Sequence, residues 1–344
     1  MLHSRRLPTL DGWRAIAILA VLSTHIRWPT PALLKLGQYG PMGVHLFFAL
    51  SGFLITTRLL EERQRSGRIN WKNFYIRRAF RILPPAFLYL AVIAILGIGL
   101  HIIPTSWSQL AASAFFYRNY LTPVSPEPWY TAHFWSLAVE EHFYLLWPLI
   151  LALSRFRKAT VLAPLLAIAV GLWRALDQHY NWVAALDPLL KDSVQRTDYR
   201  LDILLFGCAA ALLWSHAWVR NAVGRIAGSA AVAAILLATV ACLYWQPPAY
   251  LSLLAVLMAL LPVATVARPE SIVGRLLETP VLTFIGRISY SLYLWQQLFL
   301  GPLVRHPVLG IGLAILCAEV SWHLIEKPSF TLRNWLMKRE QISA

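Results

Sequence analysis

The sequence is poor in cysteine, in acidic residues and in long hydrophilic stretches. Its three cysteines, Cys208, Cys242 and Cys317, fall inside apolar runs at unrelated spacings, which excludes a disulfide framework and a cysteine-based zinc site. It has no internal repeat, no low-complexity segment and no hydrophilic insert long enough to fold as a second soluble domain. Residues 1–344 are therefore expected to form a single domain.

Charge is scarce and one-sided. Only 14% of the residues are charged, and 31 Lys and Arg oppose 16 Asp and Glu, which gives a net charge of +15. Such an excess can indicate nucleic-acid binding, but the basic residues lie in the connections between apolar segments, as membrane topology signals do. We therefore expect membrane lipids, and not nucleic acid, as partners.

Long apolar segments are what the sequence has in abundance. Hydrophobic residues make up 58% of the chain and its mean hydropathy is +0.55, well above the range of soluble domains. Segments able to cross a bilayer recur at 12–28, 41–57, 82–103, 134–153, 159–176, 200–214, 227–245, 249–267, 287–303 and 308–325. The sequence predicts an all-α, polytopic membrane protein with about ten transmembrane helices. Arg14 inside the first segment argues against a removable signal peptide.

The basic residues also predict the orientation of the chain. One set of alternate connections carries most of them, with eight between positions 58 and 81: Arg58, Arg63, Arg65, Arg68, Lys72, Arg77, Arg78 and Arg81. The other set carries only Arg27, Lys35, Arg118, Lys191, Arg196 and Arg305. The positive-inside rule then places both termini in the cytoplasm and requires an even number of spans. The expected location is a bacterial-type cytoplasmic membrane.

The first apolar segment carries two conspicuous polar residues, Arg14 and His25. They lie eleven positions apart, so at about 100° per residue both side chains project from one helix face, about 16 Å apart along the axis. In one interpretation Arg14 extends to the cytoplasmic headgroups and His25 is simply a polar residue near the outer end of the helix. In the other, His25 is a general base within the membrane, because a neutral imidazole can take a proton from a hydroxyl.

Arg78 and Arg81 stand out within the basic connection before the third segment. Their i, i+3 spacing places them on one helix face at the membrane entry, where two guanidinium groups suit a phosphate or pyrophosphate. For Arg63, Arg65 and Arg68 we favour the simpler explanation, which is topology and contact with lipid headgroups.

Glu140 and Glu141 lie within the fourth apolar segment, where packing alone hardly explains them. Adjacent helix positions point about 100° apart, so only one of the two faces a given pocket. A buried Glu–Arg pair that fixes helix packing is one explanation. The other is a carboxylate that orients His25, like the third member of a catalytic triad.

Other polar positions are compatible with either acceptor contact or a structural role. These are Asp11, Arg200, Asp202, Ser289 and Tyr290. The connection at 104–133 is rich in Trp, Tyr and Pro and suits an interfacial lid, with a half-buried helix near 109–118. Glu326-Lys327-Pro328 is expected to stop the last helix. We see no His/Asp/Glu cluster at ligand spacing, so no metal is expected.

These features together resemble the acyltransferase family 3 membrane proteins, which include O-acetyltransferases of lipopolysaccharide and other extracellular glycans. The matching segments occur in order along nearly the whole chain: Leu10-Asp11-Gly12-Trp13-Arg14 with His25, Gly43 to Ile55, Arg78-Ala79-Phe80-Arg81-Ile82-Leu83-Pro84, Trp135-Ser136-Leu137-Ala138-Val139-Glu140-Glu141, Arg200-Leu201-Asp202, Ile288 to Leu294 and Glu326-Lys327-Pro328. Two positions depart from the family pattern. His45 stands where an acidic residue is common, and Gln296 and Gln297 stand where a histidine is common, so we assign that stretch no catalytic role.

The resemblance implies transfer of an acyl group, often acetyl from cytoplasmic acetyl-CoA, to a hydroxyl of a glycan or another acceptor. It implies that His25 is catalytic with Arg14 as its partner, that Arg78 and Arg81 act near the donor, and that Glu140 or Glu141 is an active-site carboxylate. Acyl-CoA would be a co-substrate, with no permanently bound cofactor. The C-terminal hydrolase-like domain that some members carry is not expected here.

In the mechanism that we expect, Arg78, Arg81 and Arg14 hold the donor nucleotide, a glutamate holds the second ring nitrogen of His25, and the acceptor arrives from the outer side. Direct attack and a transient acyl-histidine both fit the sequence. The acceptor, the acyl chain length and the oligomeric state stay open. A secondary transporter is the main alternative function, since intramembrane Arg, His and Glu residues also form proton relays, although the halves show no inverted repeat.

Overall fold

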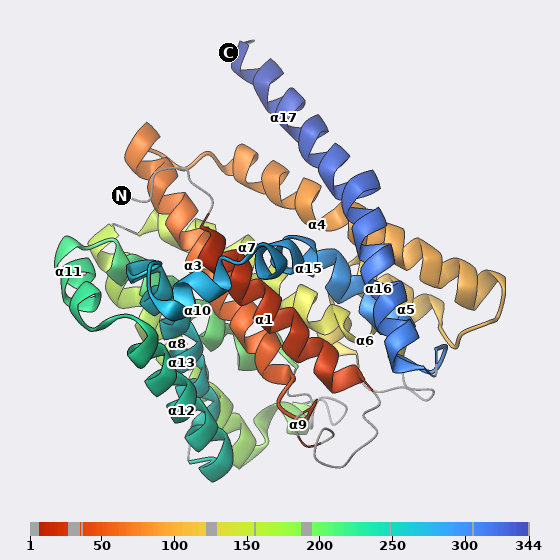
Figure 1. Ribbon diagram of the computed structural model, residues 1–344, viewed down its shortest axis with the longest axis horizontal. Helices are drawn as coiled ribbons and strands as arrows, with labels where there is room; N and C mark the ends of the chain where they lie inside the picture. Colours follow the sequence, from red (N-terminus) through yellow and green to blue (C-terminus); the bar gives the residue numbers. More distant parts are fainter. Residues whose placement is uncertain are drawn as a thin grey trace.

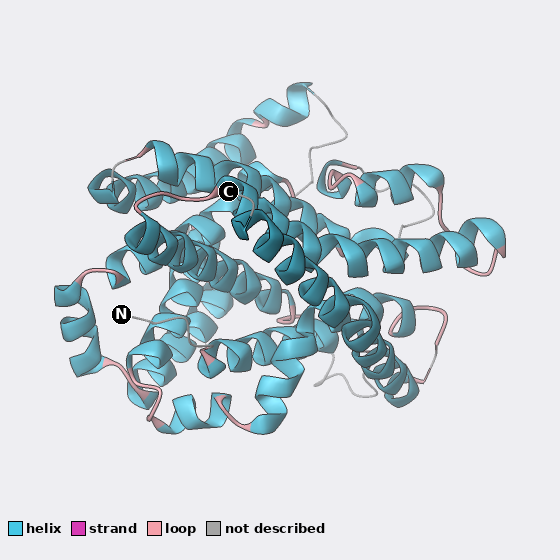
Figure 2. Cartoon of the chain, turned by 90° about the horizontal axis from the view of Figure 1, so that it is seen from above, coloured by secondary structure: helices cyan, strands magenta, loops and turns pink. Residues whose placement is uncertain are grey.

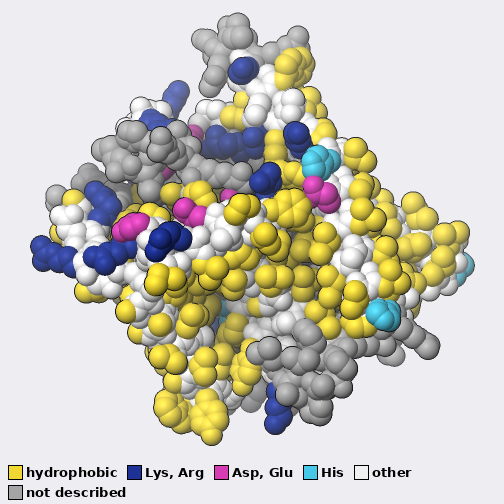
Figure 3. Space-filling model, in the orientation of Figure 1, with side chains coloured by type: hydrophobic (Ala, Val, Ile, Leu, Met, Phe, Trp, Pro, Cys, Tyr) yellow, Lys and Arg dark blue, Asp and Glu magenta, His cyan; other side chains and the backbone are white. Residues whose placement is uncertain are grey.

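The computed structural model describes residues 7–26, 35, 37–121, 129–154, 156–186, 195–247, 249–304 and 306–342. Within these residues every regular element is a helix, and the helices pack into one bundle (Figures 1 and 2). The predicted all-α class is confirmed. The positive residues also gather in space, since most Lys and Arg side chains visible in Figure 3 lie above a broad belt of hydrophobic ones.

Each of the ten predicted segments coincides with a helix. These helices are α1 (Pro8–His25), α3 (Pro41–Ser66), α4 (Trp71–Ala94) with η1 (Ile95–Gly99), α7 (Phe134–Leu153), α8 (Phe156–Tyr180), α10 (Thr197–Trp214), α12 (Ser229–Trp245), α13 (Tyr250–Ala267), α15 (Pro280–Phe299) and α16 (Pro307–Ser321). In the described part of the chain, six helical stretches are long and apolar enough to cross a membrane. α10 and α11 (Ala217–Ile226), which meet at an angle of 103°, make a seventh if the pair counts as one span. α1 and α15 are not among them, because polar residues lower their hydropathy. The polytopic architecture is confirmed, and the cytoplasmic placement of the termini stays a prediction.

Burial separates central from peripheral helices. In the most apolar window of α3, 72% of the residues are buried, whereas α8 and the stretch that begins with α16 reach only 22%. The peripheral helices expose large apolar side chains such as Leu165, Leu172, Leu237 and Leu316. Exposed apolar side chains on helices of this length are what contact with lipid requires, so α8, α12 and α16 form the lipid-facing periphery.

α1 lies against both α3 and α15 at the centre of the bundle, and α3 packs in turn on α10 (Figure 1). Glycine makes these contacts close. A Cβ on Gly286 of α15 would collide with the backbone oxygen of Asp11 in α1, and a Cβ on Gly207 of α10 would collide with that of Ala49 in α3. Small residues let membrane helices approach at backbone distance. This close approach fixes the register of α15 against α1.

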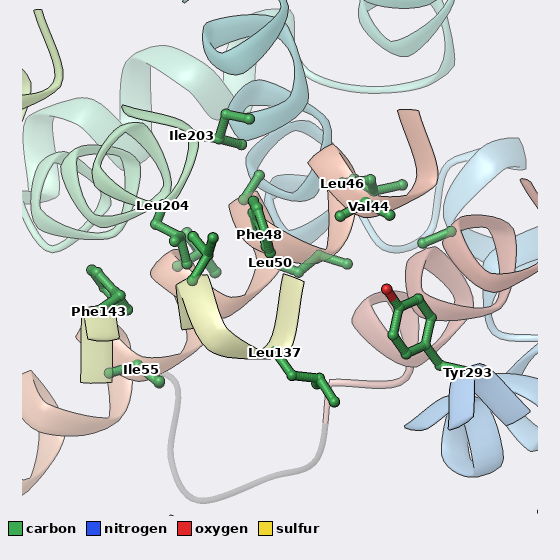
Figure 4. Close-up of a cluster of buried hydrophobic side chains, with 14 of the residues drawn as sticks. Val44, Leu46, Phe48, Leu50, Ile55, Leu137, Phe143, Ile203, Leu204 and Tyr293 are labelled. Atoms are coloured by element: carbon green, nitrogen blue, oxygen red, sulfur yellow. The ribbon is translucent and has the colours of Figure 1, made fainter. Parts of the chain in front are cut away.

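The centre of the bundle is filled with apolar side chains. Phe48 and Leu50 of α3, Leu204 of α10 and Phe143 of α7 belong to one buried cluster (Figure 4). Each is at most 2% exposed, and Leu204 is fully buried. This packing holds α3, α7 and α10 together as a rigid frame, and α1 packs against it through α3.

Short helices form the segment predicted as an outer lid. They are α5 (Trp107–Ala114), η2 (Arg118–Tyr120) and α6 (Trp129–Ala132). The helix expected near 109–118 is therefore present but begins and ends earlier, because Ser106 caps its N-terminus by accepting a hydrogen bond from the amide of Gln109. Residues 122–128 of the lid lie outside the described residues. The other short helices are α9 (Trp182–Leu186) and α14 (Ile272–Leu277).

The expected helix stop at Glu326-Lys327-Pro328 is wrong. After α16 the chain continues through the π-helical turn η4 (Trp322–Glu326) into α17 (Lys327–Ile342). Proline lacks an amide hydrogen and breaks the regular α-helical ladder. The π-helical turn directly before Pro328 absorbs this break, so the helix goes on. α17 consequently extends from the bundle at the top of Figure 1.

Candidate active site

A basic cavity of about 380 Å³ opens between the ends of α1, α3, α4, α15 and α17. We call it the vestibule. Seven arginines line it, Arg14, Arg58, Arg77, Arg78, Arg81, Arg287 and Arg333, against the two carboxylates of Asp11 and Glu326. The structure thus brings Arg14, Arg78 and Arg81 together, as the sequence predicted. Arg58, Arg77, Arg287 and Arg333 were missed, because the sequence gave no reason to separate them from ordinary topology signals.

The vestibule's positive charges are only partly balanced within the described part of the chain. Arg14 lies 3.6 Å from Asp11, Arg58 lies 3.2 Å from Glu61, and Arg77 lies 2.8 Å from Glu62. The guanidinium of Arg78 stacks 3.5 Å from the centre of the Tyr144 ring, and its Nε is buried without a hydrogen-bond partner among the described residues. The cavity is therefore strongly positive, and an anionic ligand is what it is built to receive.

A second, narrower cavity of about 80 Å³ shares Arg14, Arg78 and Arg81 with the vestibule. Its wall continues deeper into the bundle along α3, α7 and α15, past Glu140 to Tyr293. Ser51 donates to one oxygen of Glu140 at 2.8 Å and Tyr144 donates to the other at 2.9 Å. Of the two glutamates, Glu140 is thus the one that lines this cavity, which we call the inner channel.

Glu141 points elsewhere. It does not line the inner channel, and its Oε1 is buried without a hydrogen-bond partner among the described residues. Adjacent helix positions diverge by about 100°, so only one of the two glutamates was expected to face a given pocket, and that one is Glu140. Among the described residues Glu140 forms no ion pair with an arginine, and its hydrogen-bond partners are the two hydroxyls.

His25 lies near the other end of α1 and is held by an amide. Its Nδ1 is 2.8 Å from Oε1 of Gln296 on α15. Gln296 then donates through Nε2 to Gln297 at 2.9 Å, and Gln297 donates to the backbone oxygen of Trp129 at 2.9 Å. The ring of Trp129 stands edge-on to the imidazole at 5.4 Å. We call this series of donors the amide relay.

The relay fixes the tautomer of His25. Because the amide nitrogen of Gln296 donates to Gln297, its oxygen is left to accept, so Nδ1 of His25 carries the proton. The lone pair then lies on Nε2, which is the nitrogen suited to take a proton from a hydroxyl. A neutral amide plays the orienting part that a carboxylate or asparagine plays in known triads.

The expectation that a glutamate holds His25 is therefore wrong for Nδ1. Glu140 is engaged by Ser51 and Tyr144 at the inner channel, while the close contact of Gly286 with α1 sets α15 so that Gln296 meets His25. The only sequence signal for Gln296 was a pair of adjacent amides in an apolar segment. That signal was set aside because the family more often has histidine there.

Five polar positions were compatible in sequence with either acceptor contact or a structural role. The structure divides them into two groups. Asp11 pairs with Arg14, and Ser289 and Tyr290 line the inner channel, where the Tyr290 hydroxyl also donates to the backbone oxygen of Ile82 at 2.8 Å. These three lie on the vestibule side of His25, not beyond it.

Arg200 and Asp202 form the second group and join helices. Arg200 lies 2.8 Å from Nε2 of His45, and Asp202 pairs with Arg174 at 2.8 Å and accepts from Ser252 at 3.0 Å. Neither lines the vestibule or the inner channel. Their contacts fit the structural alternative, in which buried ion pairs fix the packing of α3, α8, α10 and α13.

Known proteins resemble this chain closely enough to place it in a family. A family model described as an acyltransferase domain matches residues 7–317. The peptidoglycan O-acetyltransferase OatA of Listeria monocytogenes is 29% identical over 95% of this chain and 56% of its own length. The putative peptidoglycan O-acetyltransferase YrhL of Bacillus subtilis is 30% identical over 95% of this chain and 55% of its own length.

A putative O-acetyltransferase of Staphylococcus aureus is 31% identical over 94% of this chain and 57% of its own length. The chain thus spans little more than half the length of these relatives. No solved structure matches it. Since the family model covers nearly the whole bundle, from the start of α1 into α16, the chain belongs to acyltransferase family 3.

Proposed function

We propose that this protein is a membrane O-acyltransferase that takes an acetyl group from acetyl-CoA at the vestibule and transfers it to a hydroxyl of a cell-surface glycan. The observation that carries the proposal is that the vestibule and the inner channel share Arg14, Arg78 and Arg81, and that Arg14 lies on the same helix, α1, as His25. The names of the relatives support acetyl as the acyl group and peptidoglycan as the first acceptor to test. Lipopolysaccharide, which the sequence resemblance suggested, is the second acceptor to test.

The vestibule suits the nucleotide end of the donor. Coenzyme A carries a pyrophosphate and a further phosphate, and arginine guanidinium groups bind such oxygens with paired hydrogen bonds. The pantetheine arm is thin and extended, so it fits a narrow passage better than a wide pocket. Arg14 borders both cavities, and about 16 Å of helix separates it from His25. The arm would carry the thioester over this distance.

His25 would act at the end of this path. Its Nε2 takes the proton from the acceptor hydroxyl, and the hydroxyl oxygen attacks the thioester carbonyl carbon. The carbon–sulfur bond breaks, and the leaving thiolate receives the proton from the imidazolium, so the products are an ester and free coenzyme A. In an acyl-histidine route, Nε2 attacks the thioester carbonyl carbon and coenzyme A leaves as the thiolate. The acceptor hydroxyl then attacks the acyl carbon, its proton passes to the thiolate, and the bond between carbon and Nε2 breaks to give the ester and free histidine. The amide relay orients the ring in both.

We place the vestibule at the cytoplasmic face and the lid at the outer face of a bacterial cytoplasmic membrane. The charge asymmetry of the connections supports this orientation. The donor would then enter from inside and the acceptor from beneath the lid, so that one helix, α1, connects the two compartments.

The proposal is tested with purified protein in detergent, acetyl-CoA labelled in the acetyl group and soluble peptidoglycan fragments. We expect base-labile label on the fragments and release of free thiol in equal amount. Mass spectrometry of peptidoglycan and lipopolysaccharide from cells with and without the gene identifies the acceptor. Uptake of a solute into proteoliposomes without acyl donor, together with unchanged surface glycans, would instead support a transporter.

Replacing Gln296 with alanine tests the amide relay. The substitution removes the hydrogen bond that fixes the tautomer of His25, so we expect kcat to fall by about tenfold or more, which corresponds to roughly 1.4 kcal/mol. The KM for acetyl-CoA should not change, because the vestibule is untouched. Gln109→Ala on the lid helix α5 is the matched control, since Gln109 is also buried but lies outside the relay. An unchanged kcat in the Gln296 variant would contradict the orienting role.

A further inference from the structure

The vestibule is completed by residues that lie beyond the part of the chain matched by the family model. That match ends at residue 317, yet Trp322, Glu326, Phe330 and Arg333 line the cavity. Their spacings of four, four and three positions place them on one face of the helix formed by η4 and α17. Opposite them, Leu332 and Trp335 are half-exposed, at 50% and 49%. α17 therefore turns one specific face toward the cavity.

This helix is too long to serve only as a membrane span. The continuous stretch Pro307–Lys338 has 32 residues, about 48 Å at 1.5 Å per residue, whereas the hydrocarbon core of a bilayer is about 30 Å thick. The last turns consequently pass beyond the hydrocarbon, where α17 packs against α4. Phe330 and Arg333 thus line the vestibule on a helix that packs against α4, the helix that carries Arg77.

The side chains of this face make an aromatic and cationic surface. The guanidinium of Arg333 lies over the Phe330 ring, 5.1 Å from its centre, and the Trp322 ring meets Phe330 edge-on at 5.9 Å. Arg333 also donates to Asn334 at 2.9 Å, which holds the guanidinium in place. Arg77 and Arg81 are near enough to repel Arg333 electrostatically. Such like charges around an aromatic ring suit a ligand that combines a planar base with phosphates.

We propose that Phe330 and Arg333 of α17 form the subsite for the nucleobase of the acyl donor, with the Phe330 ring stacking on the base. This inference rests on the proposed function, which brings a nucleotide-bearing donor to the vestibule. It adds a division of labour: the arginines of α1 and α4 hold phosphate oxygens, whereas α17 recognises the base. Stacking of a base on an aromatic side chain contributes about 1–3 kcal/mol.

Two donors that differ only in the nucleotide separate this role from a structural one. Acetyl-CoA carries the base and the phosphates, whereas S-acetylpantetheine has the same thioester and arm without them. For Phe330→Ala we expect the KM for acetyl-CoA to rise on the order of tenfold, because the base loses the aromatic ring on which it stacks. The kcat with acetyl-CoA and the KM for S-acetylpantetheine should match those of the wild type. Phe330→Trp should restore the KM for acetyl-CoA, and Arg333→Ala should raise it.

Trp335→Ala is the matched control, because it removes an exposed aromatic side chain from the same helix and should leave both KM values unchanged. Equal KM changes for the two donors in Phe330→Ala would overturn the subsite and assign Phe330 to packing. No change for either donor would overturn it as well. A wild-type protein that acetylates no acceptor from either donor would instead refute the proposed function itself. The activity with S-acetylpantetheine also shows that each variant is folded.

Discussion

His25→Ala is expected to abolish acetyl transfer to the acceptor while the protein stays in the membrane at normal abundance. General base catalysis contributes about 10²–10⁴-fold to a rate, and the alanine variant has no other group hydrogen-bonded to the amide relay that could replace the imidazole. The hydrogen bond to Gln296 is lost with it. Transfer of labelled acetyl to peptidoglycan fragments by purified protein measures the effect, and immunoblotting of membranes measures the abundance.

His142→Ala is the control for this variant. His142 lies on α7 and contacts Thr197 at 2.7 Å, away from the amide relay, so its loss should leave the rate within a few-fold of the wild type. Full activity of His25→Ala would refute the catalytic assignment. The same variant also distinguishes the two routes. Labelled donor is added without acceptor and the reaction is stopped with denaturant at neutral pH, because acid hydrolyses an acyl-imidazole. Label on the wild type but not on His25→Ala would indicate an acyl-histidine.

Arg78→Ala combined with Arg81→Ala is expected to raise the KM for acetyl-CoA by about a hundredfold or more. Hydrogen bonds to charged groups contribute about 1.5–3 kcal/mol each, and about 1.4 kcal/mol corresponds to a factor of ten. Both residues border the vestibule and the inner channel, where the donor would bend from its phosphates into its arm. Initial rates at varied acetyl-CoA and fixed acceptor give the KM, and the converse series gives that of the acceptor.

Arg65→Ala combined with Arg68→Ala is the matched control, because it removes two exposed arginines from the same basic connection that do not line the vestibule. The donor KM of this control should equal that of the wild type. If the Arg78 and Arg81 substitutions changed only the KM for the acceptor, the donor would have to bind elsewhere. A rise in the KM for acetyl-CoA in both double variants would mean that net charge, and not the position of the guanidinium groups, governs donor binding.

The sequence was sufficient for the fold because crossing a bilayer imposes a length and a composition on each helix separately. For this reason all ten apolar segments were located without any knowledge of how they pack. The helix stop expected at Pro328 was wrong because it was inferred from the proline alone. Whether a proline ends a helix depends on the turn before it, and no local sequence pattern indicates the π-helical turn Trp322–Glu326.

From the sequence, only those parts of the site that lie on a single helix could be predicted. Arg14 with His25 and Arg78 with Arg81 were found because each pair shares one helix face, and periodicity reveals such pairs. Gln296 could not be found in this way, since its contact with His25 depends on the register of α15 against α1, which the contact of Gly286 with Asp11 sets. The carboxylates were considered first because a charged residue is conspicuous in an apolar segment. The neutral amide of Gln296, which contacts the His25 imidazole, is much less conspicuous.

The vestibule has a consequence for how the proposed reaction would respond to the state of the cell. Its arginines face the part of the donor that the reaction leaves unchanged, so spent coenzyme A keeps every phosphate and the base that the cavity would hold. Free coenzyme A should then compete with acetyl-CoA for the same place. The rate of surface modification would follow the ratio of the two in the cytoplasm, which links the outer face of the cell to its supply of activated acetyl groups.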